Sequence, residues 1–259
     1  MDCNLRQNHR VIRRFDVCDP EQLERAITAA TSAVRRGEVV VVPTESAYGL
    51  ATDAFRGDGL ARLRHLKNRG AELPVPVLIG SHAALDELMD PVGIEARELA
   101  GAFWPGLLTL VGYAKPSLTW AVAGLDDPTV SLRMPLHPVT WALAKSVGPL
   151  ALTGANIAGA DLPTTCDEAA AYFGNGATVY LDAGPCLMDT ASSVVDVTAS
   201  PPRLLRAGGV TLEQLRTIVP DLVGRAEDPP PSGVGEQPAA TLADESQDPG
   251  PPVDNSGAR

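Results

Sequence analysis

The stretch EVVVVPTESAYGL, residues 38–50, decides how the rest of the chain is interpreted. Its β-branched run ends at Pro43 and is too short for a helix, so it predicts a buried strand over residues 39–42. The polar segment TESAY, residues 44–48, follows directly, and polar groups at the carboxyl end of a buried strand commonly bind ligands in open α/β sheets. An ordinary turn, helped by Gly49, explains the same segment equally well.

Strand-like and helix-like segments alternate on both sides of this stretch. Upstream, Asp19 and Pro20 provide an N-cap and a first helical position, and Gly37 ends the helix. We expect further helices at residues 60–66, 81–89, 95–103, 137–147, 167–173 and 211–219, and further strands at 75–80, 107–112, 129–133, 150–153, 178–181, 193–197 and 203–206. Strands interleaved with helices indicate an α/β fold with a mixed sheet.

Composition divides the 259 residues into a globular body and an acidic tail. The whole chain carries a net charge of −11, of which residues 226–259 contribute −6 through seven acidic residues and Arg259. This segment also holds seven prolines, four glycines and no aromatic residue, so we expect it to be disordered. The predicted organisation is an N-terminal extension at 1–19, one domain at 20–225 and a disordered acidic, proline-rich tail at 226–259.

Charge and cysteine usage exclude several classes of protein. The body carries −5, whereas a dedicated nucleic-acid binder is basic overall, so any anion site must be local. The four cysteines show no CxxC spacing, which argues against a zinc site and a disulfide scaffold, and no protein-bound metal is predicted. No apolar run approaches the roughly 18 residues of a membrane helix, and the N-terminus lacks a signal-peptide pattern. We therefore expect a reduced cytoplasmic protein with no membrane partner.

Three further motifs offer groups for binding an anion. RLRHLKNR, residues 62–69, is cationic; a solvated helix face explains it, but Lys67 and Arg69 at the helix end can also reach a phosphate or carboxylate. ALTGANIAG, residues 151–159, runs from a short strand into a turn of small residues where Asn156 offers a donor and an acceptor, although a loop without a ligand fits as well. It matches neither the dinucleotide-binding nor the Walker glycine pattern.

The last motif lies near the end of the predicted domain. Ser192 and Ser193 open one predicted strand, and Arg206 closes the next. No histidine occurs in a recognisable partner motif for a serine nucleophile, so Ser192 is better explained as a hydrogen-bonding group.

Seven blocks in chain order together resemble the YrdC-like family and, within it, the bacterial threonylcarbamoyl-AMP synthases. The resemblance covers about residues 20–220, and we expect the short form without the extra C-terminal domain of longer members. The blocks are PTESAYGL, KNR with Pro74 after it, FWPGLLTL at 103–110, LRMPLHP at 132–138, GANIAG, SSVVD and LRAGG.

The resemblance implies a YrdC-like twisted mixed sheet with flanking helices and a large concave pocket. It also implies synthesis of L-threonylcarbamoyladenylate and pyrophosphate from L-threonine, bicarbonate and ATP, the first step of threonylcarbamoyladenosine modification of tRNA. Magnesium is expected to arrive with ATP. The expected macromolecular partners are the tRNA threonylcarbamoyl transferase complex, through hand-over of the product, and double-stranded RNA or tRNA.

The resemblance also assigns roles to residues of this chain, although no residue emerges as a general base. By the family pattern, Thr44, Arg133 and Ser192 bind threonine. The nucleotide is lined by Lys67, Arg69, Thr109, Asn156 and Arg206.

Departures from the family pattern keep two other functions open. Gly154 and Ala158 stand where the family has serines, and one hydrogen bond to a charged group is worth about 1.5–3 kcal/mol. Ser193, Ala207 and Ala47 are further changes that leave every cation in place. One alternative is a non-catalytic binder of RNA or a nucleotide on the same scaffold. The other is a carbamoyl-transfer module like that of hydrogenase-maturation proteins, which predicts carbamoyl phosphate as substrate.

Overall fold

The computed structural model describes residues 12–225, except for residues 69, 71–73, 119–127 and 189. The tail at 226–259, the first part of the N-terminal extension and Arg69 therefore lie outside the described residues. Within the described part of the chain, no helix combines the length and the apolar character needed to cross a bilayer.

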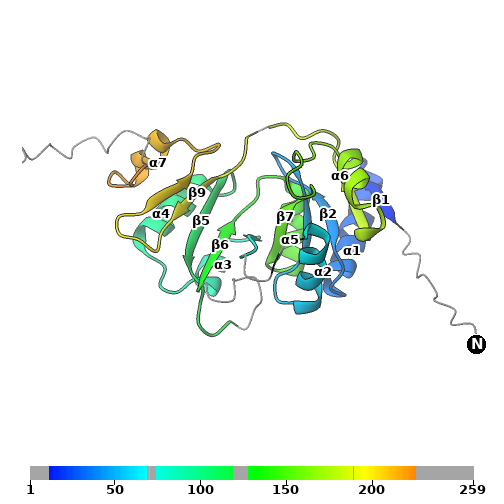
Figure 1. Ribbon diagram of the computed structural model, residues 1–259, viewed down its shortest axis with the longest axis horizontal. Helices are drawn as coiled ribbons and strands as arrows, with labels where there is room; N and C mark the ends of the chain where they lie inside the picture. The colour runs from blue at the N-terminus through cyan, green and yellow to red at the C-terminus, as the bar shows by residue number, and fades with distance from the viewer. Residues whose placement is uncertain (1–11, 69, 71–73, 119–127, 189, 226–259) are drawn as a thin grey trace, which may run out of the picture.

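Ten strands of the described residues form one mixed sheet, which confirms the α/β prediction. From edge to edge their order is β1-β8-β2-β3-β7-β4-β6-β5-β9-β10, and the sheet contains both parallel and antiparallel neighbours (Figure 1). The strands are β1 (Arg13–Asp16), β2 (Val40–Pro43), β3 (Tyr48–Asp53), β4 (Val77–Leu78), β5 (Leu108–Tyr113), β6 (Thr129–Arg133), β7 (Leu150–Gly154), β8 (Val179–Asp182), β9 (Ser193–Asp196) and β10 (Arg203–Arg206).

The helices follow the capping signals of the sequence. Asp19 Oδ1 accepts a hydrogen bond from Glu21 N at 2.9 Å, and Pro20 occupies the first helical position of α1. The helices are α1 (Pro20–Arg35), α2 (Gly57–Lys67), α3 (Ala83–Leu88), α4 (Ile94–Phe103), α5 (Pro138–Val147), α6 (Cys166–Phe173) and α7 (Leu212–Ile218), with a 3-10 turn at Gly174–Gly176.

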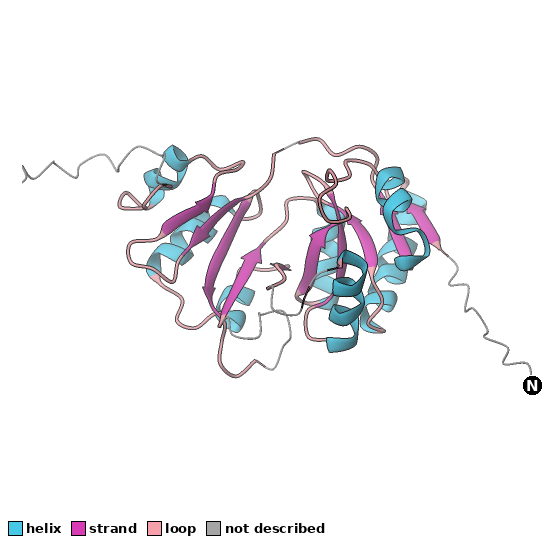
Figure 2. Cartoon of the chain, in the orientation of Figure 1, coloured by secondary structure: helices cyan, strands magenta, loops and turns pink. Residues whose placement is uncertain are grey.

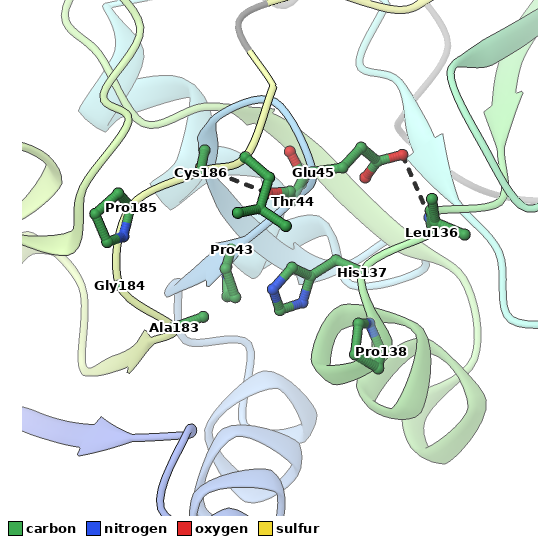
Figure 3. Close-up of a pocket in the computed structure, with 11 residues that line it drawn as sticks. Pro43, Thr44, Glu45, Leu136, His137, Pro138, Ala183, Gly184, Pro185 and Cys186 are labelled. Atoms are coloured by element: carbon green, nitrogen blue, oxygen red, sulfur yellow. Dashed lines mark hydrogen bonds between the residues drawn. The ribbon is translucent and has the colours of Figure 1, made fainter.

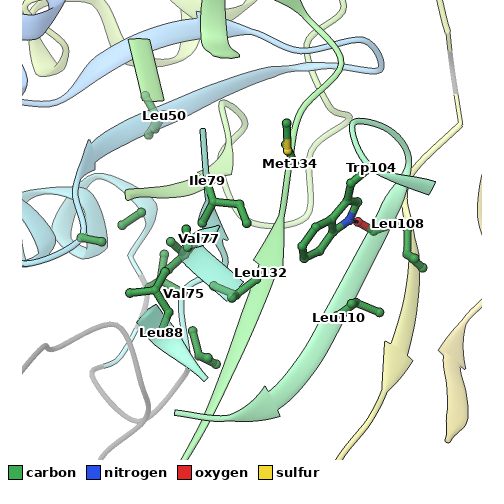
Figure 4. Close-up of a cluster of buried hydrophobic side chains, with 14 of the residues drawn as sticks. Leu50, Val75, Val77, Ile79, Leu88, Trp104, Leu108, Leu110, Leu132 and Met134 are labelled. Carbon is green, nitrogen blue, oxygen red and sulfur yellow. Dashed lines mark hydrogen bonds between the residues drawn. The ribbon is translucent and has the colours of Figure 1, made fainter. Parts of the chain in front are cut away.

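Helices cover the sheet on both sides, which produces two hydrophobic cores (Figure 2). In the smaller core, α1 and α5 pack on β1, β8 and β2, because the alanines of α1 let it lie close to the strands. In the larger core, the other helices pack on the opposite face, and Trp104 donates from Nε1 to the carbonyl of Leu108 at 2.7 Å (Figure 4). Successive side chains of a strand point to opposite faces of the sheet, so the neighbour of a residue in one core lies on the other face.

Two strands were not predicted. β1 falls inside the segment set apart as an N-terminal extension, so the sheet begins upstream of residue 20. Only Phe15 of its four residues is buried, and a charged tetrapeptide gives no strand pattern. β3 pairs with β2 across the turn that carries Thr44, so the polar segment that follows β2 is a hairpin turn whose exit is the buried strand from Tyr48.

Candidate functional site

A cavity of about 560 Å³ lies on the sheet face opposite the larger core. On β5, Leu108 and Leu110 enter the core while Thr109 lines the cavity, and on β6 Leu132 enters the core while Arg133 lines the cavity. The expected concave pocket is therefore present. Its lining residues are Thr44, Ser46, Ala47, Tyr48, Gly49, Pro76, Leu78, Thr109, Ser131, Arg133, Leu152, Thr153, Gly154, Leu162, Thr164, Ala191, Ser192, Val194 and Arg206.

Two arginines and two hydroxyls form the polar side of this cavity. Arg206 donates from Nη2 to Ser192 Oγ and from Nε to the Ser192 carbonyl, both at 3.0 Å. Thr109 Oγ1 and Ser192 Oγ share a hydrogen bond of 2.9 Å. Burial, together with the nearby charge of Arg133, lowers the pKa of Arg206. Two guanidinium groups held this close favour an anionic ligand, because an anion between them relieves their repulsion.

Arg133 is fixed in the cavity wall by a buried carboxylate. Its Nη2 donates to Glu45 Oε1 at 2.5 Å and its Nε donates to the Gly106 carbonyl at 3.0 Å. The Arg133 and Glu45 side chains are only 12% and 6% exposed. Leu136 N also donates to Glu45 Oε1, at 3.3 Å. Sequence reasoning noted Glu45 in the polar segment after β2 but gave it no role. Its position two residues after the end of a buried strand was the available signal.

Thr44 shapes the hairpin turn between β2 and β3. Its hydroxyl donates to the Ala47 carbonyl at 2.6 Å and accepts from Ala47 N at 3.2 Å. The residue is 6% exposed, and it lines the cavity. Thr44 therefore presents a hydroxyl that the turn itself holds in place.

Lys67 and Asn156 lie next to the cavity at the end of β7. Lys67, the last residue of α2, donates from Nζ to the Gly154 carbonyl at 2.9 Å and to Asn156 Oδ1 at 2.7 Å. Asn156 Nδ2 donates to the Ala160 carbonyl at 2.6 Å. Lys67 therefore ties helix α2 to the loop after β7.

A smaller pocket of about 230 Å³ lies beside the main cavity and shares Thr44 with it. His137 and Glu45 also line this pocket (Figure 3). Burial lowers the pKa of His137, and the nearby Glu45 carboxylate opposes that shift. The Nδ1 atom of His137 and the Oε2 atom of Glu45 are buried without a hydrogen-bond partner.

The structure brings most of the predicted site residues into one place. Of the residues assigned to threonine and the nucleotide, five line a single cavity: Thr44, Thr109, Arg133, Ser192 and Arg206. Lys67 and Asn156 adjoin it through Gly154. Among the residues that the structure describes, no three His, Cys, Asp or Glu side chains come together as a metal site.

Comparison with protein families identifies the scaffold. The model of the Sua5/YciO/YrdC family, described as telomere recombination, matches residues 32–208. The chain belongs to this family. The match spans strands from β2 to β10 and includes every lining residue of the cavity.

Individual proteins similar to this chain also belong to the Sua5/YciO/YrdC family. A Mycobacterium tuberculosis protein provisionally named as a threonylcarbamoyl-AMP synthase is 43% identical over 205 residues, which cover 79% of this chain and 94% of the relative. The threonylcarbamoyl-AMP synthase of Bacillus subtilis is 35% identical over 196 residues, 74% of this chain and 56% of the relative.

Solved structures of the family agree with this fold. The structure of Pyrococcus abyssi Sua5 complexed with L-threonine matches with a TM-score of 0.76 and 31% identity, over 83% of this chain and 62% of that one. Escherichia coli YciO matches with a TM-score of 0.66, over 77% of this chain and 95% of that one, and at 21% identity it supports the fold alone.

Proposed function

We propose that this protein is a threonylcarbamoyl-AMP synthase that makes L-threonylcarbamoyladenylate and pyrophosphate from L-threonine, bicarbonate and ATP. One observation carries the proposal: Arg133 and Arg206 converge with the hydroxyls of Thr44, Thr109 and Ser192 in a single cavity. Relatives of 35–43% identity carry the synthase name, and one family structure holds L-threonine.

The cavity chemistry fits these substrates. The threonine amine attacks the bicarbonate carbon, an N–C bond forms, and water leaves with a proton from the amine, which gives a carbamate. A carbamate oxygen then attacks the α-phosphorus of ATP, an O–P bond forms, and the bond to pyrophosphate breaks. Every substrate carries negative charge, and preorganised cations and hydroxyls stabilise such charge during the reaction. We assign the main contribution of the protein to positioning and water exclusion.

Within this proposal, the residues divide between two substrates. Thr44, Arg133 and Ser192 hold threonine, with Arg133 at its carboxylate, while Thr109 and Arg206 face the nucleotide. Lys67 and Asn156 support the nucleotide side of the cavity through the loop after β7. Arg69, which lies outside the described residues, is assigned to the nucleotide by the family resemblance alone. Magnesium accompanies ATP as part of the substrate.

The biological setting also belongs to the proposal. The product passes to the tRNA threonylcarbamoyl transferase complex in the cytoplasm, with contact to tRNA or double-stranded RNA during hand-over. We expect these partners from the family resemblance, and the expectation holds only if the protein has the synthase activity.

A pyrophosphate-release assay tests the proposed function. Purified protein with MgATP should release pyrophosphate only when L-threonine and bicarbonate are both present. Arg206→Ala should lose most of that release, whereas Arg97→Ala, an exposed arginine paired with Asp86, should retain it. ATP binding without turnover supports the non-catalytic binder instead, and turnover that depends on carbamoyl phosphate supports the carbamoyl-transfer module.

A further inference from the structure

The cavity has an apolar side as well as a cationic side. On that side Gly49 of β3 pairs with Gly154 of β7, so two neighbouring strands present no side chain at this register. Leucine side chains cover both glycines, because a Cβ atom at Gly49 would meet Leu152 and one at Gly154 would meet Leu162. Leu78 also lines the cavity. Three leucine side chains therefore contribute an apolar surface to the cavity lining.

Leu162 occupies the space that Gly154 leaves free. A Cβ atom at position 154 would collide with Leu162 Cδ2, and it would lie 3.1 Å from Asn156 Oδ1. Residues 154 and 162 are therefore sterically coupled: a larger residue at 154 requires Leu162 to move. Because the colliding atom is the end of a leucine side chain, this movement is feasible without displacing the backbone.

Leu162 is held at this edge by the backbone on either side of it. Tyr48 N donates to the Pro163 carbonyl at 2.8 Å, and Asn156 Nδ2 donates to the Ala160 carbonyl at 2.6 Å. Leu162 nevertheless remains 50% exposed. An anchored but half-exposed leucine at a cavity rim can bury its free surface against a ligand.

We propose that Leu162 is a specificity-determining residue that packs against the adenine ring of ATP, with Leu152 beside it on the same apolar surface. The inference rests on the proposed function, which supplies the three substrates. Threonine offers only one methyl group, and bicarbonate and the triphosphate offer no apolar surface. The adenine ring is the one extended apolar face among them, and it suits the apolar surface to which Leu162 contributes.

Leucine truncation tests this contact directly. Leu162→Ala should raise the Kd for ATP by about tenfold, as expected for the loss of a buried leucine side chain against a ligand. The KM for L-threonine and the melting temperature should stay unchanged. Ile157→Ala is the matched control, since Ile157 belongs to the same loop and is 48% exposed, yet it does not line the cavity.

The steric coupling gives a second, independent readout. Gly154→Ser should weaken ATP binding in the native background, because it pushes Leu162 away, but should add no further loss to Leu162→Ala. Isothermal titration calorimetry measures the Kd for ATP in each variant without requiring turnover. A protein without synthase activity would contradict the proposed function, while the contact between Leu162 and adenine could still be measured. Unchanged ATP affinity in Leu162→Ala, an equal loss in Ile157→Ala, or additive losses in the double variant would each overturn the inference.

Discussion

Replacing Glu45 by glutamine tests whether the buried ion pair holds the cationic wall of the cavity. The Arg133 and Glu45 side chains are 12% and 6% exposed, so the substitution leaves a guanidinium with little access to water and no opposite charge. Removing one partner of a buried pair costs about 3–5 kcal/mol of unfolding free energy. We expect the lower end, about 3 kcal/mol, because the glutamine oxygen can still accept a hydrogen bond from Arg133.

An exposed pair within the same chain provides the control. Asp86 accepts from Arg97 with two hydrogen bonds, and the two side chains are 52% and 51% exposed. Asp86→Asn should cost at most about 1 kcal/mol, since water screens such pairs. At about 2–4 °C per kcal/mol for a domain of this size, Glu45→Gln should lower the melting temperature by roughly 6–12 °C and Asp86→Asn by less than about 4 °C. Scanning calorimetry measures both. Equal losses in the two variants, or a Glu45→Gln loss below about 1 kcal/mol, would refute the assignment of Glu45 as the support of Arg133.

Three other predictions follow from the site. Ser192→Ala removes the acceptor of Arg206 and the partner of Thr109; we expect kcat/KM to fall by about tenfold to a hundredfold, because a hydrogen bond to a charged group is worth about 1.5–3 kcal/mol, and wild-type kinetics would contradict a role for this hydroxyl. Lys67→Ala releases the loop after β7 from helix α2, so both thermal stability and pyrophosphate release should fall; a loss of activity at full stability would instead mean that Lys67 serves the substrate alone. Burial lowers the pKa of His137, so the unfolded chain binds a proton at this residue at a higher pH than the folded protein does. The free energy of unfolding therefore decreases as the pH falls below about 6.5. Denaturant unfolding at several pH values should show this loss reduced in His137→Gln and retained in a variant of the exposed His65, whereas identical pH profiles in both variants would assign the loss to other groups.

Local signals in the sequence were enough for most elements of the fold. Proline and glycine punctuation bounded helix α1 and strand β2, and the strand over Thr129–Arg133 appears at its predicted position. The two strands that were missed depend on distant partners. β1 pairs with β8 far along the chain, and β3 is a continuously buried strand interrupted by Gly49 and Thr52, so neither shows the two-residue alternation of a half-buried strand.

The residues of the site also fall into those that the sequence predicted and those that only the fold brings together. The blocks that resemble the YrdC-like family identified the residues around Ser192, Arg133 and Arg206, which the fold then brings into one cavity. The contact between Glu45 and Arg133 joins positions 88 residues apart, and no local pattern encodes such a contact. In the sequence, Gly154 was interpreted as the loss of a hydroxyl group, whereas the structure shows that Leu162 fills the space that a Cβ atom at this position would need.

Incorporation of labelled bicarbonate tests the central claim most directly. The protein is incubated with MgATP, L-threonine and ¹³C-bicarbonate, and the products are separated and analysed by mass spectrometry. A synthase yields threonylcarbamoyl-AMP carrying one ¹³C atom in its carbamoyl group, and omission of threonine abolishes this product. AMP without any labelled adduct, or a labelled product that forms without threonine, would contradict the proposed reaction.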